Sequence, residues 1–216
     1  SSSMRPYPYQ YASFLFAYYY FLFYISPMIY KAKHHFIIYP FFKWYAKRKT
    51  GRVFTSAHIL HNVQTKKAPV LLISNHISWW DGFWAMYLNL KLFNRKFHFM
   101  MLEEQLRKYW FFNYTGGFSI NKKSRTIIES INYAGALLSK PENLVLLFPQ
   151  GEIQSVYQQE IRFEKGIERI VKMAKRDIQL IFNANLIDYF SKPKPSVFMY
   201  ATEYSKTDFR SEERRV

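Results

Sequence analysis

After residue 51 the chain alternates between short apolar runs and longer amphipathic stretches. Continuous apolar runs are typical of strands buried on both faces of a sheet, and apolar residues at helical spacing are typical of helices packed against one. The pattern predicts strands at 69–74, 97–102, 144–149, 178–187 and 196–204, and helices at 81–92, from 124 or 126 to 139, and at 166–176. We therefore expect an α/β domain with a mixed, mostly parallel sheet flanked by helices.

The N-terminal part has a different pattern. Residues 6–30 carry no charge, and residues 11–30 contain ten aromatic side chains. This length could cross a bilayer, but the tyrosines and the Ser26-Pro27 break favour the membrane interface. A single span and a half-embedded helical hairpin both remain open, and the hairpin is favoured. A buried helix of a soluble domain fits less well, because aromatic rings would surround it on every side.

Residues 28–49 interleave lysines and one arginine with aromatic and aliphatic side chains. Segments that lie on a membrane have this composition, with cationic stems reaching the phosphates and rings sunk into the acyl boundary. We therefore predict three parts: a membrane-associating helical segment over residues 4–50, an α/β domain over 51–205, and a polar tail over 206–216.

The formal net charge is +16, and it is unevenly distributed. Residues 1–80 contain ten Lys and Arg and no acid, so Asp81 is the first negative charge. Such a basic field suits nucleic acid, anionic lipid headgroups or a polyphosphorylated ligand, and charge alone does not choose among them. The chain has no cysteine, which excludes disulfides, thiolate zinc sites and a cysteine nucleophile.

The stretch SNHISWWDGFW places His76 five residues before Asp81. In a helix the two side chains would be roughly 140° apart, and in a strand up to about 17 Å apart, so they can meet only across a turn. A strand ending near Ser74 and a helix that Asp81 would cap supply such a turn. A carboxylate on one imidazole nitrogen fixes the tautomer, so that the other nitrogen can take a proton from a hydroxyl. Taken alone, the spacing is better explained by an ordinary loop histidine.

Three later segments also carry polar side chains at the ends of predicted elements. The stretch 116–125, GGFSINKKSR, puts three cations at a predicted helix start, which is typical of a phosphate site. FPQGE follows the third strand at 148–152, and FEKG opens the third helix at 163–166. The other histidines lack the spacing of a metal site, and we expect them to serve at the surface or in packing. They are His34, His35, His58, His61 and His98.

In this order the segments resemble the lysophosphatidate and glycerolipid acyltransferase family, whose hallmarks are N-H-x4-D, a G-(x)-I-x-R/K block, F-P-E-G and an F-K-x-G-like element. The resemblance implies that His76 is the general base on an acceptor hydroxyl, which attacks an acyl thioester, and that Asp81 orients it. It also implies that the aromatic N-terminus corresponds to the family's membrane-embedded two-helix element. The substrate-binding residues it implies are Asn75, Gly116, Lys122, Lys123, Arg125, Gln150, Gly151 and Glu152.

The chain departs from the family pattern at the third and fourth blocks. Gln150 stands where the family usually has Glu, and Glu152-Ile153 replaces Thr-Arg. A glutamine can still bond a hydroxyl but carries no charge, and isoleucine cannot replace a bidentate phosphate partner. The usual proline is also missing from residues 180–185. A glycolipid, an aminoacyl lysolipid or a glycosylated isoprenoid would tolerate this pocket better than lysophosphatidate.

We therefore expect a membrane-bound O-acyltransferase that moves a fatty acyl group from acyl-CoA or acyl carrier protein to a lysophospholipid, related lysolipid or glycolipid. We expect no cofactor, no metal and no nucleic-acid partner, and a place on the cytoplasmic face of the inner (plasma) membrane. A non-catalytic membrane- or nucleic-acid-binding module remains an alternative, which would depend on the lysines of residues 31–49 rather than on His76. A soluble enzyme is a third, and it would need the first 45 residues to be dispensable.

Overall fold

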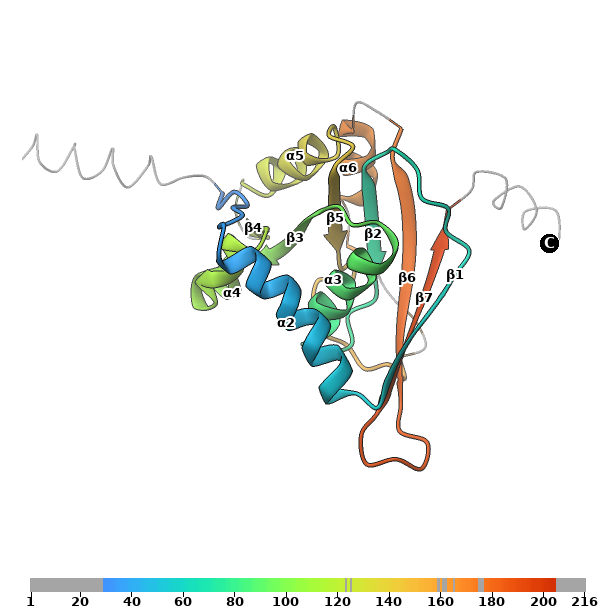
Figure 1. Ribbon diagram of the computed structural model, residues 1–216. Helices are drawn as coiled ribbons and strands as arrows, with labels where there is room; N and C mark the ends of the chain where they lie inside the picture. The colour runs from blue at the N-terminus through green and yellow to red at the C-terminus, as the bar shows by residue number, and fades with distance from the viewer. Residues whose placement is uncertain are drawn as a thin grey trace, which may run out of the picture.

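A seven-stranded sheet forms the centre of the protein in this computed structural model (Figure 1). The structure describes residues 29–204, apart from 123, 125, 159, 161, 162, 165, 175 and 176. The strand order is β1-β7-β6-β2-β5-β3-β4, and neighbouring strands are parallel except β6 and β7. The strands are β1 (Ser56–His61), β2 (Val70–Ser74), β3 (Lys96–Leu102), β4 (Gly117–Ile120), β5 (Asn143–Leu147), β6 (Gln179–Asp188) and β7 (Ser196–Glu203).

Helices cover both faces of this sheet (Figure 1). On one face lie α2 (Ile38–Val53) and α3 (Asp81–Leu92), and on the other α5 (Ile127–Leu137) and α6 (Ile167–Met173). Helix α4 (Glu103–Lys108) and the 3-10 helix η1 (Trp110–Tyr114) connect β3 to β4.

Strand β2 shows why the apolar runs of the sequence are continuous. Val70 and Leu72 belong to the core beneath α2 and α3, whereas Leu71 and Ile73 belong to the core beneath α5 and α6. Successive strand residues point to opposite faces, so a strand between two helical layers needs an apolar side chain at every position. The expectation of a mixed, mostly parallel sheet flanked by helices is confirmed.

Two edge strands were not predicted. Strand β1 has the sequence SAHILH and is largely exposed, and β4 has only four residues. Neither contains a long apolar run: β1 is covered less than a central strand, and β4, although mostly buried, is too short. The third predicted strand also ends earlier, at Leu147, and the second predicted helix begins later, at Ile127.

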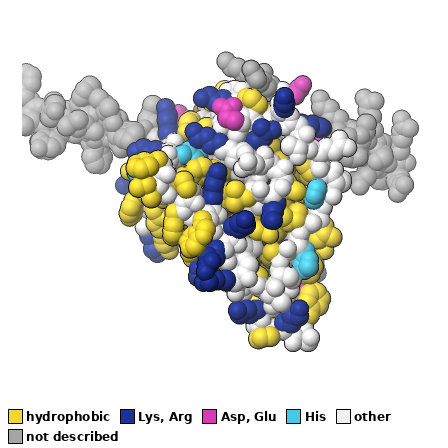
Figure 2. All heavy atoms as spheres, viewed as in Figure 1, with side chains coloured by type: hydrophobic (Ala, Val, Ile, Leu, Met, Phe, Trp, Pro, Cys, Tyr) yellow, Lys and Arg dark blue, Asp and Glu magenta, His cyan; other side chains and the backbone are white. Residues whose placement is uncertain are grey.

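Helix α2 packs on the domain with one side and exposes aromatic rings on the other. Phe42, Ala46 and Thr50 recur every four residues and are buried. Phe41 and Trp44 are 58% and 53% exposed. Some apolar residues of the helix therefore face the domain core and others face the surface. Figure 2 shows hydrophobic and basic side chains interspersed on the surface over α2.

The predicted membrane span or hairpin lies in residues 6–30, almost entirely outside the described residues. Among the described helices, none is both long and apolar enough to cross a bilayer. Helix α2 runs across the predicted boundary at residues 50 and 51. The three-part division of the chain stays a prediction.

Candidate active site

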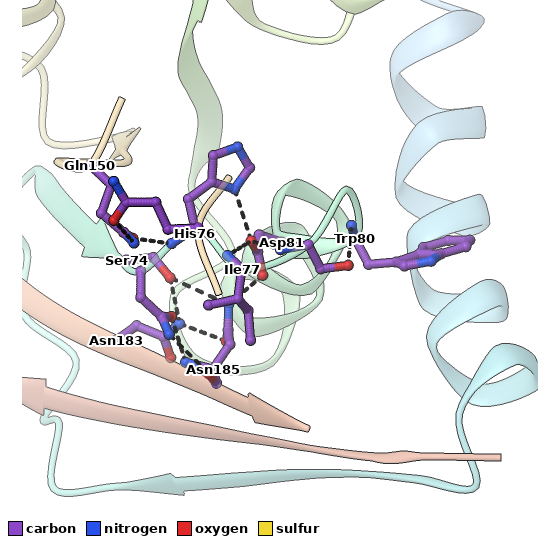
Figure 3. A network of polar contacts seen from close by, with 11 residues as sticks. Ser74, His76, Ile77, Trp80, Asp81, Gln150, Asn183 and Asn185 are labelled. Carbon is purple, nitrogen blue, oxygen red and sulfur yellow. Dashed lines mark hydrogen bonds and ion pairs between the residues drawn. The ribbon is translucent and has the colours of Figure 1, made fainter. Parts of the chain in front are cut away.

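The loop between β2 and α3 brings His76 and Asp81 together (Figure 3). Strand β2 ends at Ser74 and α3 begins at Asp81, so the two side chains meet across the turn between them. The imidazole Nδ1 of His76 lies 2.8 Å from Oδ2 of Asp81. The two side chains thus meet in the one way that their spacing allows, across a turn.

Asp81 is fully buried, and both of its carboxylate oxygens take part in hydrogen bonds. Its Oδ2 also accepts the backbone N–H groups of Ile77 at 2.7 Å and Ser78 at 2.8 Å, and its Oδ1 accepts Nδ2 of Asn185 at 3.2 Å. Since both oxygens accept, Nδ1 of His76 must donate, and the lone pair of the imidazole lies on Nε2. Figure 3 shows that other ring nitrogen pointing away from the network.

The prediction that Asp81 caps α3 is wrong. Asp81 is the first helical residue, Trp80 occupies the cap position, and no side chain caps the helix. The carboxylate instead bonds the N–H groups of the preceding loop and the imidazole, which leaves it directed at the histidine rather than at the helix.

A buried polar cluster from β6 supports the carboxylate, and the sequence reading missed it. Asn183 donates from Nδ2 to Ser74 Oγ and to Asn185 Oδ1, both at 2.9 Å. Asn185 is fully buried beneath Asp81 (Figure 3). Buried and exposed positions alternate along β6. Two asparagines at buried positions of a strand were therefore the sequence signal that could have revealed this cluster.

The backbone of His76 is held by the loop after β5. Gln150 accepts the His76 N–H with its Oε1, and the Gln154 N–H donates to the His76 carbonyl at 2.8 Å. The imidazole stacks on Phe148 with a centroid distance of 4.1 Å and an interplanar angle of 12°. The ring is therefore fixed from below by Asp81 and along its face by Phe148, as a positioned base requires.

His76 lines a largely apolar cavity of about 450 Å³. Rings and aliphatic side chains from both helical layers form its wall, while Lys122, Glu152 and Glu164 bring charge to it. Among the described residues, none bonds His76 Nε2. The apolar lining includes Phe42, Phe83, Phe97, Phe99, Met100, Met101, Phe112, Ile131, Leu147, Ile167 and Ile170.

The residues that the resemblance assigned to substrate binding divide into four groups. Lys122, Gly151 and Glu152 line the cavity. Gly116 does not: its φ is +105°, and an added Cβ would overlap the Phe97 carbonyl oxygen. Lys123 and Arg125 lie outside the described residues.

Asn75 and Gln150 hold backbone rather than line the cavity. Asn75 donates from Nδ2 to the Asn185 carbonyl at 2.9 Å and accepts the Asn185 N–H at 2.7 Å. This pair ties the loop to β6, as Gln150 ties it to the loop after β5. Asn75 and Gln150 therefore hold the loop that carries His76 in place.

Two other histidines, half-buried His34 and buried His98, lie outside the cavity lining. His34 bonds the Phe97 carbonyl with Nε2 at 2.8 Å, and its ring meets that of His98 at 4.7 Å. Burial lowers the pKa of His34 to about 4 and the pKa of His98 to about 3. With these pKa values both rings are neutral near pH 7. Within the described part of the chain, no group of His, Asp and Glu could hold a metal ion.

Comparison with known proteins agrees with this architecture. The family model described as Acyltransferase matches residues 55–182. The crystal structure of the 1-acyl-sn-glycerophosphate (LPA) acyltransferase PlsC from Thermotoga maritima is similar, with a TM-score of 0.51 and 16% sequence identity, over 81% of this chain and 72% of that one. At this identity the similarity shows a shared fold. A search of curated proteins found no match.

Proposed function

The chain belongs to the acyltransferase family, and from that premise we propose that it transfers a fatty acyl group from a thioester donor to a hydroxyl of a lipid acceptor, with His76 as general base. The observation that carries this proposal is the position of His76. Its Nδ1 is hydrogen-bonded to Asp81, and the residue lines a largely apolar cavity.

The reaction needs a base but no enzyme nucleophile. The acceptor hydroxyl gives its proton to Nε2 of His76 while its oxygen attacks the thioester carbonyl carbon. Collapse of the tetrahedral intermediate breaks the carbon–sulfur bond, and the imidazolium returns the proton to the leaving thiolate. Asp81 holds the proton of the neutral imidazole on Nδ1, which leaves the lone pair on Nε2, and it stabilises the imidazolium between the two steps.

The cavity suits a hydrocarbon chain. Removing a chain from water contributes about 0.8 kcal/mol per buried methylene, and an apolar wall provides that gain without polar groups to desolvate. The donor would be acyl-CoA or acyl carrier protein, and the acceptor a lysophospholipid or a related lysolipid, with no further cofactor.

The exposed surface of α2 supports membrane binding. Phe36, which lies just before the helix, is 80% exposed. Within the helix, Lys43 and Arg48 lie over the rings of Tyr39 and Trp44 at 4.9 and 5.5 Å. Rings beside cations suit the boundary between acyl chains and phosphates. We place the protein on the cytoplasmic face of the inner membrane, because that leaflet is anionic.

The test is to incubate the full chain in mixed vesicles with labelled acyl-CoA or labelled acyl carrier protein and a panel of lysolipids, and to identify products by mass. We expect an O-acylated lysolipid with at least one donor. Vesicle binding without any product would contradict the proposal and favour the non-catalytic module.

A further inference from the structure

The charged end of the cavity contains an ion pair. Lys122 Nζ lies 2.7 Å from Glu164 Oε1, with side chains 39% and 56% exposed. Both residues line the cavity that also contains His76, and Glu152 lines it as well. Lys122, which we expected from the sequence to bind phosphate, therefore already has an acidic partner.

The surrounding backbone holds this pair at the cavity. The N–H of Glu164 donates to the Pro149 carbonyl at 2.7 Å, which fixes Glu164 beside the turn after β5. Gly151 has a φ of +71°, and a Cβ there would overlap Lys122 Nζ and press on Glu164. The glycine thus leaves the space that the ion pair fills.

We propose that this end of the cavity selects a zwitterionic lysolipid headgroup, one that carries a single anion and an ammonium group. This inference rests on the proposed acyl transfer and names the class of its acceptor. The headgroup anion forms an ion pair with Lys122, and the ammonium group forms ion pairs with Glu164 and Glu152. When this headgroup binds, Lys122 and Glu164 separate, and each is then paired with the oppositely charged group of the ligand.

A phosphomonoester fits less well for the same reason. Its dianion would have to displace Glu164 from Lys122 and then lie beside two carboxylates. Repulsion between like charges in a binding site discriminates strongly against the ligand that brings them together. Ile153, which also lines the cavity, offers no compensating donor.

The experiment compares kcat/KM for acceptors that differ at one group: lysophosphatidylethanolamine, its N-acetyl derivative, which lacks the ammonium, and lysophosphatidate. A hydroxylated N-acyl amino acid lipid with a free amine distinguishes a phosphodiester zwitterion from an aminoacyl one. The variants are Glu164→Gln and Glu152→Gln. Glu168→Gln is the matched control, because Glu168 lies on α6, is 91% exposed and does not line the cavity.

We expect the wild-type protein to prefer the free amine over its N-acetyl derivative, and Glu164→Gln to reduce that preference by about fivefold, the effect of one partly exposed ion pair. Glu152→Gln should act in the same direction, and Glu168→Gln should leave the preference unchanged. A wild-type preference for lysophosphatidate, or a preference for the amine that both variants preserve, would overturn the inference while leaving acyl transfer intact. Transfer to no acceptor at all would overturn the proposed function and this inference with it.

Discussion

Replacing Asp81 by asparagine should separate catalysis from folding. The Oδ2 atom accepts three hydrogen bonds and Oδ1 accepts one. Asparagine has one carbonyl oxygen, which can take the three-bond position. Its NH2 group then faces Nδ2 of Asn185, where the structure has a 3.2 Å hydrogen bond.

The magnitudes follow from these contacts. One buried donor left without an acceptor costs about 1–3 kcal/mol, which a domain of ordinary stability survives. The imidazolium formed during proton transfer loses its buried anion, and the hold on the imidazole tautomer is weakened. The same Asp-to-Asn change in a catalytic triad reduces kcat by about 10⁴-fold. KM should change little, because Asp81 is fully buried behind His76.

The assay is steady-state transfer of a labelled acyl group, combined with urea unfolding of the same preparations. The double variant Asp81→Asn/Asn185→Asp serves as the control, because the new carboxylate accepts the amide of residue 81. It should recover most of the lost stability and none of the activity. A single variant with more than about a tenth of wild-type kcat, or a double variant with restored kcat, would refute the role of Asp81.

Three further predictions concern other parts of the protein. The pKa of His98 is about 3 in the folded state and about 6.5 in the unfolded state, so the unfolded state binds more protons below pH 6.5. Titration of His98 should therefore lower stability by about 1.4 kcal/mol for each pH unit between 6.5 and about 3, and His34, whose folded-state pKa is about 4, adds to this fall. His98→Asn should show the smaller pH dependence, as measured by urea unfolding. Gly116→Ala should cost about 2 kcal/mol or more, because Cβ meets the Phe97 carbonyl, whereas Gly51→Ala, which meets nothing, should be neutral or stabilising. Phe41→Ser/Trp44→Ser should weaken binding to anionic vesicles by at least about tenfold in a sedimentation assay, and unchanged binding would contradict membrane contact through α2.

The sequence predicted the central elements of the fold because their signals are local. Strands β2 and β5 are buried at every position and read as apolar runs, and α3 begins and ends where its pattern predicts. The family match confirms the resemblance found from the four blocks. The edge strand β1 escaped detection because it is largely exposed, and β4 because its four residues, GFSI, are too few to form an apolar run.

The site was predictable where it depends on spacing, and not where it depends on strand order. His76 and Asp81 are five residues apart, so one turn decides whether they meet. Asn185 reaches Asp81 only because β6 pairs with β2, a neighbour relation that the sequence pattern does not specify. The ion pair of Lys122 with Glu164 likewise joins residues 42 positions apart.

The most direct test of the central claim is acyl transfer by His76→Ala beside wild type and His58→Ala. His58 lies on β1 and stacks on Phe198, away from the cavity lining. We predict that loss of the imidazole at position 76 removes product formation while unfolding midpoint and vesicle binding stay near those of wild type, and that His58→Ala remains active. Wild-type turnover by His76→Ala would contradict the account.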